Sequence, residues 1–177
     1  FGLTTTETTD MGIGQKIVEM TEHIDYVSPM IYPSHYNKGE YGIADPNKEP
    51  YRTVYIALQG AKKRIPVEKL RPWLQDFSMN KVKYGPQQIQ EQIQACFDSG
   101  IETWMLWNAS CKYTKDGLKQ DGQIYKKSSK ETIDAYLKKE DVNEAMKKRA
   151  LKQNTTSKNA VKKSTQTVTK KHPVKSK

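Results

Sequence analysis

The sequence predicts an α/β fold in which short parallel strands alternate with helices. Segments rich in β-branched and aromatic residues occupy positions 24–32, 70–77 and 101–107, as expected for buried strands. Segments with apolar residues at helical spacing separate these strands and follow the last one. Strands that alternate with helices of ten or more residues are typical of parallel βαβ units, so the three strands are expected to run in the same direction.

The first two elements are predicted to be a helix and a strand. The helix begins at Asp10 or Gly14, with Asp10 as its cap, and its apolar residues lie at positions 17, 18 and 20. The strand at 24–32 ends before Pro33. A loop rich in Gly, Asn and Pro then extends to Pro50.

Two longer helices follow, and each begins with a proline in its first turn. We expect them to start at Pro50 and Pro86, because proline is favoured at the first helical position, and Gly100 ends the second one. Between them, Pro72 lies inside the strand at 70–77 and disfavours regular pairing. Their apolar faces consist of Val54, Ala57, Leu58 and Ala61 in the first helix and Ile89, Ile93, Cys96 and Phe97 in the second.

The last predicted helix follows the third strand. Ser128 and Glu131 have the spacing of a capping box, ahead of apolar residues at positions 133, 136 and 137. The same pattern continues to about Leu151.

The positive charge of the chain is concentrated at its C-terminal end. The formal net charge is +10, from 30 basic and 20 acidic residues, and residues 145–177 hold 11 of the basic residues and no acidic one. The first 144 residues therefore carry 19 basic and 20 acidic side chains, a net charge of −1. A body of this charge does not match a basic nucleic-acid-binding domain.

The C-terminal tail has a composition that predicts disorder. Residues 153–177 are mainly Thr, Ser, Asn, Gln and Lys, which leaves them little to bury. Their charge would attract anionic polymers such as nucleic acid, acidic lipid or a cell-wall polymer. The tail has no aromatic residue to stack on bases, which argues against specific nucleic-acid recognition. A solvated extension without a binding role is the alternative.

Several other classes of site find no support in the sequence. No apolar run approaches the roughly 18 residues of a transmembrane helix. Cys96 and Cys111 are too few for a disulfide framework, and Cys96 is expected in the core. The histidines have no metal-ligand spacing, and Gly12-Ile13-Gly14 lacks the third glycine of a dinucleotide loop. We therefore predict neither a metal nor a cofactor.

Three motifs occur at the predicted strands in a fixed order. They resemble the bacterial family named putative glycosyl hydrolase domain, a family of unknown function, over residues 1–139. The motifs, which Phe1-Gly2 and Asp10-Met11-Gly12-Ile13-Gly14-Gln15 precede, are Asp25-Tyr26-Val27-Ser28-Pro29-Met30-Ile31-Tyr32-Pro33-Ser34-His35-Tyr36, Leu70-Arg71-Pro72-Trp73-Leu74-Gln75-Asp76-Phe77 and Trp104-Met105-Leu106-Trp107-Asn108-Ala109.

The resemblance implies a TIM-type (β/α)₈ barrel, of which this chain would be the C-terminal half. Such a barrel takes about 250 residues, whereas about 150 are expected to be globular here. The three strands would then be the sixth, seventh and eighth, and a strand-four aspartate motif that looks catalytic in the family would lie upstream. The residues alone leave a small open sheet as the alternative.

We accordingly expect three parts: a half-barrel at 1–139, a helix extension at 140–152 and the disordered tail at 153–177. A half-barrel has two unpaired sheet edges and an open core, so it should self-associate or fold poorly alone. The resemblance also favours an extracellular or cell-surface location and a polysaccharide or oligosaccharide substrate.

Aromatic residues at the strand ends are the first candidates for a binding cleft. Function in this barrel class lies where strands run into their βα loops, and aromatic rings there would stack on sugar rings. The alternative is that the rings fill the barrel core, which we expect for Trp104 and Met105. The candidate cleft residues are Tyr32, Tyr36, Trp73 and Trp107.

Asp76 is the candidate catalytic residue, because it is a carboxylate at the C-terminal end of a predicted strand. Glycoside hydrolysis generally uses two carboxyl groups, roughly 5–5.5 or 6.5–9.5 Å apart. Arg71 and Gln75 are close to Asp76 along the strand and are predicted to bind substrate. The alternative is that Asp76 caps the βα loop through nearby backbone N–H groups. Weaker carboxylate candidates in other loops are Glu7, Asp10, Glu40 and Asp45.

His35 and Asn108 complete the predicted substrate-binding set. His35 is expected to bind a sugar hydroxyl or to hydrogen-bond within its loop. It is not expected to pair with Ser34 as nucleophile and base, because adjacent side chains on an extended chain point to opposite sides.

Three functional hypotheses follow. The first is a polysaccharide-cleaving glycoside hydrolase domain that is inactive without its upstream half. The second is a non-catalytic carbohydrate-binding barrel, which keeps the aromatic residues but lacks paired carboxylates. The third is binding of a polyanion or cell-wall polymer through the basic tail.

Overall fold

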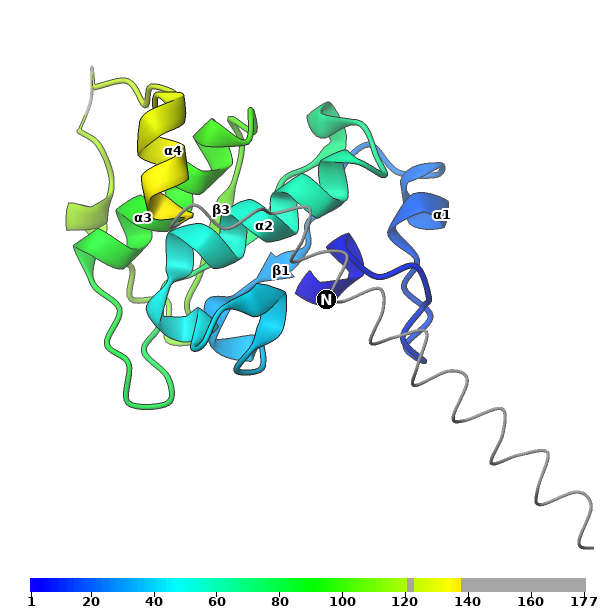
Figure 1. Cartoon of the computed structure of the whole chain (residues 1–177), viewed down its shortest axis with the longest axis horizontal. Helices are drawn as coiled ribbons and strands as arrows, with labels where there is room; N and C mark the ends of the chain where they lie inside the picture. The colour runs from blue at the N-terminus through cyan, green and yellow to red at the C-terminus, as the bar shows by residue number, and fades with distance from the viewer. Residues whose placement is uncertain (121–122, 138–177) are drawn as a thin grey trace, which may run out of the picture.

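Three short strands form one parallel sheet (Figure 1). They are β1 (Met30–Ile31), β2 (Trp73–Gln75) and β3 (Met105–Trp107), in the order β1-β2-β3. The computed structural model describes residues 1–120 and 123–137. In this part of the chain the predicted α/β arrangement with parallel strands is confirmed, as a small open sheet. The partial barrel stays a prediction.

The strands are shorter than the sequence predicts, because prolines interrupt the hydrogen-bond ladder. The carbonyl of Pro29 accepts a hydrogen bond from the N–H of Trp73 at 3.0 Å, but proline has no N–H to donate in return. Pro72 places the same gap immediately before β2. Ahead of β1, Val27 forms only an isolated bridge with Leu70.

The described residues contain four α-helices: α1 (Ile17–Thr21), α2 (Pro50–Lys62), α3 (Pro86–Asp98) and α4 (Lys130–Tyr136). Both α2 and α3 begin at the predicted proline, and α3 ends before Gly100, whose φ of +77° favours glycine. Short 3₁₀ helices lie in the connections: η1 (Gly2–Thr5), η2 (Pro33–His35), η3 (Glu40–Gly42), η4 (Pro46–Lys48), η5 (Val67–Lys69) and η6 (Lys115–Gly117).

The first helix starts later than predicted. Asp10 does not cap it, because its Oδ1 accepts a hydrogen bond from the N–H of Gly12 at 3.0 Å within a turn. Gly12 and Gly14 have positive φ values of 73° and 71°, which prevent a continuous helix, and α1 begins only at Ile17.

The last helix is capped one residue later than predicted. The hydroxyl of Ser129 accepts a hydrogen bond from the N–H of Thr132 at 3.3 Å and caps α4. The hydroxyl of Ser128 instead accepts a hydrogen bond from Gln94 in α3 at 3.1 Å. A tertiary contact therefore displaces the predicted capping box by one position.

The two faces of the sheet differ in how far their side chains are buried. Register places Ile31, Leu74 and Leu106 together on what we call the core face, where Ile31 and Leu74 are fully buried. Successive residues of a strand point to opposite faces. The other side, which we call the open face, therefore carries Met30, Trp73, Gln75, Met105 and Trp107.

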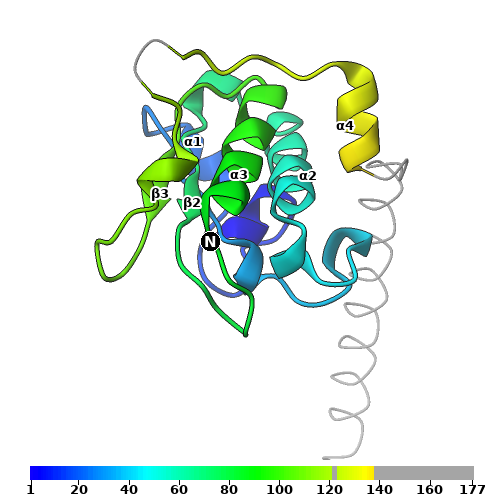
Figure 2. The same cartoon turned by 90° about the vertical axis from the view of Figure 1, so that its left-hand side faces the viewer.

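One hydrophobic core joins the core face to α2 and α3, which lie side by side (Figure 2). Cys96 is fully buried in it, as predicted, and burial raises the pKa of its thiol. Trp104 packs against this core, whereas Met105 lies on the open face. Their predicted place in a barrel core stays a prediction. Other fully buried core residues are Val54, Ala57, Leu58, Ile89 and Ile93.

The predicted helix extension at 140–152 and tail at 153–177 lie outside the described residues, as do the last two residues of the predicted half-barrel. In the part of the chain that the structure describes, no helix is long and apolar enough to cross a membrane.

Candidate functional site

The strand ends bring most of the predicted site residues to one edge of the sheet. Tyr32 and His35 follow β1, Asp76 follows β2, Trp107 ends β3 and Asn108 comes next. Because the strands are parallel, their carboxyl ends meet at the same edge, which is where α/β proteins place their sites.

Asp76 is buried and bound to the loop that follows β3. Its exposed fraction is 2%. The carboxylate Oδ2 accepts a hydrogen bond from the N–H of Thr114 at 2.7 Å, and Oδ1 accepts one from the Thr114 hydroxyl at 2.7 Å. The backbone N–H of Asp76 donates to the carbonyl of Trp107 at 2.9 Å, and its carbonyl accepts from the side-chain amide of Asn108. Asp76 therefore fixes the end of β3 and the loop beyond it.

Gln75 is fully buried and links β2 by hydrogen bonds to η2, to the turn after β2 and to α3. Its Oε1 accepts a hydrogen bond from the N–H of Ser34 at 3.0 Å, and its Nε2 donates to the carbonyl of Phe77 at 2.8 Å. Since β1 ends at Ile31, the backbone of Gln75 has no strand beside it on that side. The side chain of Gln92 takes the strand's place, accepting from the Gln75 N–H at 2.9 Å and donating to its carbonyl at 2.8 Å.

Arg71 lies at the other end of β2, away from the strand ends. Its guanidinium carbon lies 3.9 Å from the centre of the Tyr26 ring. The backbone N–H of Arg71 donates to the carbonyl of Val27 at 3.0 Å. Five residues of extended chain correspond to roughly 16 Å, so Arg71 does not approach Asp76. The structure does not bring this predicted substrate ligand to the site.

Tyr32, His35 and Phe77 form an edge-to-face aromatic cluster. The ring centres of Tyr32 lie 5.4 Å from His35 and 5.5 Å from Phe77, and those of His35 and Phe77 are 5.9 Å apart. Burial raises the pKa of Tyr32 to about 12, with a smaller contribution from Tyr113. His35 is the most exposed member of the cluster, Phe77 is partly exposed and Tyr32 is buried.

Ser34 and His35 form a hydrogen bond that the sequence analysis excluded. The Ser34 Oγ lies 3.0 Å from the Nδ1 of His35. That prediction was wrong because the chain is not extended here: Pro33–His35 form η2, and the turn brings the two adjacent side chains together. The hydrogen bond holds the imidazole beside the ring of Tyr32.

Trp107 is the most exposed aromatic residue among the predicted site residues. It is 44% exposed on the open face and meets Trp73 edge to face, with ring centres 5.9 Å apart. Tyr36 is only 7% exposed, and its ring centre lies 5.4 Å from that of Tyr41. This burial agrees with the alternative that the ring fills the core. Trp107 is therefore the ring at the strand ends that offers the most surface to a ligand.

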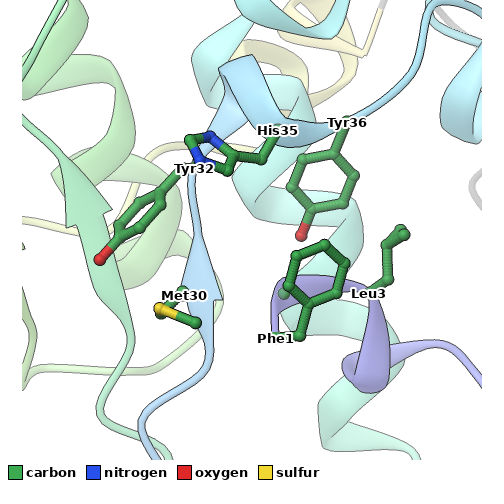
Figure 3. A pocket seen from close by; sticks show the side chains of 7 residues that line it. Phe1, Leu3, Met30, Tyr32, His35 and Tyr36 are labelled. Carbon is green, nitrogen blue, oxygen red and sulfur yellow. The ribbon is translucent and has the colours of Figure 1, made fainter. Parts of the chain in front are cut away.

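A small cavity lies beside β1 (Figure 3). Its volume of about 100 Å³ is below the roughly 300–1,000 Å³ of ligand pockets. A side chain at position 2 would meet the Met30 carbonyl and the Tyr36 hydroxyl, so Gly2 allows the close approach. The cavity is lined by Phe1, Gly2, Leu3, Met30, Tyr32, His35 and Tyr36.

Metal ligation finds no support in residues 1–120 and 123–137. No group of three or more His, Cys, Asp or Glu side chains there is arranged to hold a metal ion.

Three residues that build the site were not anticipated from the sequence. Thr114 binds Asp76 from 38 positions away, in a loop with no periodic pattern. Gln92 lies on the buried side of α3, and a polar residue among apolar ones at helical spacing was the signal for it. Phe77 ends the predicted strand motif and only the turn after β2 places it on Tyr32 and His35.

Comparison with known proteins identifies one family. The family model described as Putative glycosyl hydrolase domain matches residues 1–113, a span that includes every predicted site residue. No curated protein and no solved structure matches the chain.

Proposed function

We propose that this chain, which belongs to the family described as Putative glycosyl hydrolase domain, contributes to the cleavage of glycosidic bonds in a polysaccharide. The observation that carries the proposal is the position of Asp76, whose backbone N–H binds the carbonyl of the exposed Trp107. A glycoside-cleaving site combines a carboxyl group with a surface that binds a sugar ring. The backbones of the residues that carry these two groups are hydrogen-bonded at the strand ends.

We also propose that the three strands are part of a (β/α)₈ barrel. Parallel strands covered by helices on one face only, with polar and aromatic residues at their carboxyl ends, agree with a barrel segment. In such a barrel the open face, with Met30, Trp73 and Met105, would turn toward the interior. The remaining strands would cover it.

Each site residue has a proposed role. Trp107 stacks on the face of a sugar ring, and His35 binds a hydroxyl from the neighbouring strand end. Asp76 supplies one of the two carboxyl groups. Because Thr114 occupies both of its oxygens, a role in catalysis requires that substrate binding draws Thr114 away from one of them. Tyr32 positions the His35 ring through an edge-to-face contact, and Asn108 positions Asp76 through a hydrogen bond to its backbone carbonyl.

The test is release of reducing ends from a panel of polysaccharides by a protein in which this chain is part of a complete barrel, and by its Asp76→Asn variant. Loss of a group that transfers protons lowers turnover by about 10²–10⁴-fold. The fold should survive, because an Asn amide can accept from the Thr114 N–H and donate to its hydroxyl. Unchanged turnover in Asp76→Asn, with the melting temperature preserved, would exclude Asp76 from the chemistry.

Thr114→Val is the matched control. It removes the hydrogen bond from the hydroxyl and leaves the one from the backbone, so the carboxylate keeps one of its two hydrogen bonds and is held less firmly. If Asp76 only holds the loop, Thr114→Val should impair the protein more than Asp76→Asn does. If Asp76 acts on the substrate, the order of the two variants reverses.

A second function is favoured by one specific observation. Both carboxylate oxygens of Asp76 are already hydrogen-bonded, which suits a structural residue in a non-catalytic carbohydrate-binding domain. In that case no polysaccharide is hydrolysed, and Trp107→Ala or Trp73→Ala abolishes retention of the protein on glycan-containing affinity gels. Turnover of any polysaccharide by the protein would exclude this alternative.

A further inference from the structure

A groove on the helical side of the molecule is distinct from the strand ends. It is lined by α3, by residues of the connection from β3 to α4 on either side of 121–122, and by Tyr136 of α4. Its volume of about 420 Å³ falls within the range of ligand pockets, roughly 300–1,000 Å³. The lining residues on which the argument depends are Gln87, Gln90, Glu91 and Gln94 of α3, with Tyr125 and Tyr136 opposite.

We propose that this groove is a second binding site, for a neutral oligosaccharide. Four of its nine lining residues are glutamines, whose side-chain amides both donate and accept and so match the hydroxyl groups of sugars. Glu91 and Lys119 are charges of opposite sign in the same lining, so the groove favours a ligand without net charge. The ligand class rests on the proposed function, whereas the location of the groove does not.

The tyrosine at one end of the groove is held in place by other rings. Tyr136 stacks on Tyr51 with ring centres 4.0 Å apart, and Tyr51 stacks in turn on Tyr55 at 5.8 Å. Tyr136 is still 40% exposed. A ring that is backed on one side and open on the other provides a flat surface for the C–H face of a sugar.

The amides of the groove retain hydrogen-bonding capacity. Gln90 is exposed, and its side chain forms no hydrogen bond with another residue that the structure describes. The Gln94 Nε2 lies within hydrogen-bond distance of Asp98, the Lys126 carbonyl and Ser128, which share its two N–H groups, and its Oε1 remains able to accept. Gln87 donates to Glu91 at 2.9 Å, which fixes both side chains along α3.

A buried carboxylate positions the walls of the groove. Asp98 is 3% exposed and accepts hydrogen bonds from the Tyr51 hydroxyl at 2.8 Å and the Ser128 N–H at 2.6 Å. Burial, followed by this hydrogen bond, raises the pKa of Tyr51. Asp98 therefore joins α2, α3 and the segment leading to α4, and keeps the groove formed without a ligand.

Gly117 sets the other wall. A side chain there would lie 2.7 Å from the Cβ of Ile89, so only glycine lets η6 approach α3 this closely. The same loop is bound to Asp76 through Thr114, which ties the groove's wall to the strand ends.

The experiment is an NMR titration of the ¹⁵N-labelled full chain with maltohexaose, cellohexaose and chitohexaose in turn. At least one of these should shift the side-chain amide signals of Gln90 and Gln94 in a saturable way. Gln90→Ala should weaken that binding by about three- to tenfold, as expected for the loss of one hydrogen bond. No movement of either amide signal with any of the three oligosaccharides would overturn the proposal.

Two further variants separate ring contact from folding. Tyr136→Ala should weaken binding by about tenfold, whereas Tyr136→Phe should keep it within about twofold because the ring remains. Equal loss in both variants with an unchanged melting temperature would contradict the stacking role.

Trp107→Ala distinguishes this proposal from the proposed function. Binding in the groove should be unaffected by Trp107→Ala, and hydrolysis should be unaffected by removal of groove contacts on short substrates. If groove signals shift but no polysaccharide is cleaved, only the proposed function fails. If cleavage occurs and the groove signals do not move, only the second site fails.

Discussion

The two faces of the sheet come from the same alternating strands but have different surroundings. On the core face Ile31 and Leu74 are fully buried, whereas on the open face Met30 is 41% and Trp107 is 44% exposed. Apart from Gln75, the paired strand residues on both faces are apolar, so composition alone does not distinguish the two faces. The difference shows that the described fold is stabilised chiefly by one face, while the other presents large apolar side chains at the proposed site.

The largest effect should come from removing a side chain of the core face. Leu74→Ala leaves a cavity between the sheet and the helices and should lower the free energy of unfolding by about 2–5 kcal/mol. Met30→Ala is the matched control on the open face and should cost less than about 1 kcal/mol, because its side chain already contacts water. Urea unfolding of both variants measures the difference, and equal losses would show that the open face is covered in solution.

A smaller effect is expected at the one open-face position that is fully buried. Gln92 binds both backbone groups of Gln75, so Gln92→Leu leaves the Gln75 N–H and carbonyl without partners. The apolar contacts of the buried leucine offset part of that penalty, so the net loss of unfolding free energy should be about 1–3 kcal/mol. Gln90→Ala on the exposed side of α3 serves as the control and should leave the urea midpoint unchanged. A neutral result for Gln92→Leu would mean that water replaces the amide.

The smallest effect is a pH dependence of stability at Tyr32. Its pKa is raised from 10.0 to about 12, so folding favours the neutral phenol. The stabilisation is fully present below pH 10 and is lost as the pH rises through about 12. Between pH 10 and about 12, the melting temperature of Tyr32→Phe should therefore fall less steeply than that of the wild type. The other tyrosines are the same in both proteins. Parallel curves for the two proteins would show that Tyr32 ionises freely.

Local patterns in the sequence predicted the elements but not their contacts. Pro50, Pro86 and Gly100 marked helix boundaries correctly, because each acts through its own backbone. The capping box at Ser128 was displaced because Gln94 binds that hydroxyl. The strands are shorter than predicted because Pro29 and Pro72 have no N–H group. Which hydrogen bonds are lost depends on the partner strand.

The candidate site was predictable in its position and less so in its detail. Parallel strand ends were expected to gather Tyr32, Asp76 and Trp107, and they adjoin the same edge of the sheet. The interlock of Asp76 with Thr114 was not predictable, since it joins residues 38 positions apart through an irregular loop. Arg71 does not reach Asp76, because five residues of extended strand separate the two and its guanidinium lies over the Tyr26 ring.

The sequence by itself determined the order of the elements, the membership of the family and the charge of the tail, because these depend on composition, periodicity and motifs. Only the tertiary structure decided which face of the sheet is buried, which oxygens of Asp76 are occupied and where a groove of ligand size lies. The physical reason is that burial and hydrogen bonding are relations between segments far apart in the chain. Each segment carries its own propensity, whereas its partners are chosen only when the whole fold is formed.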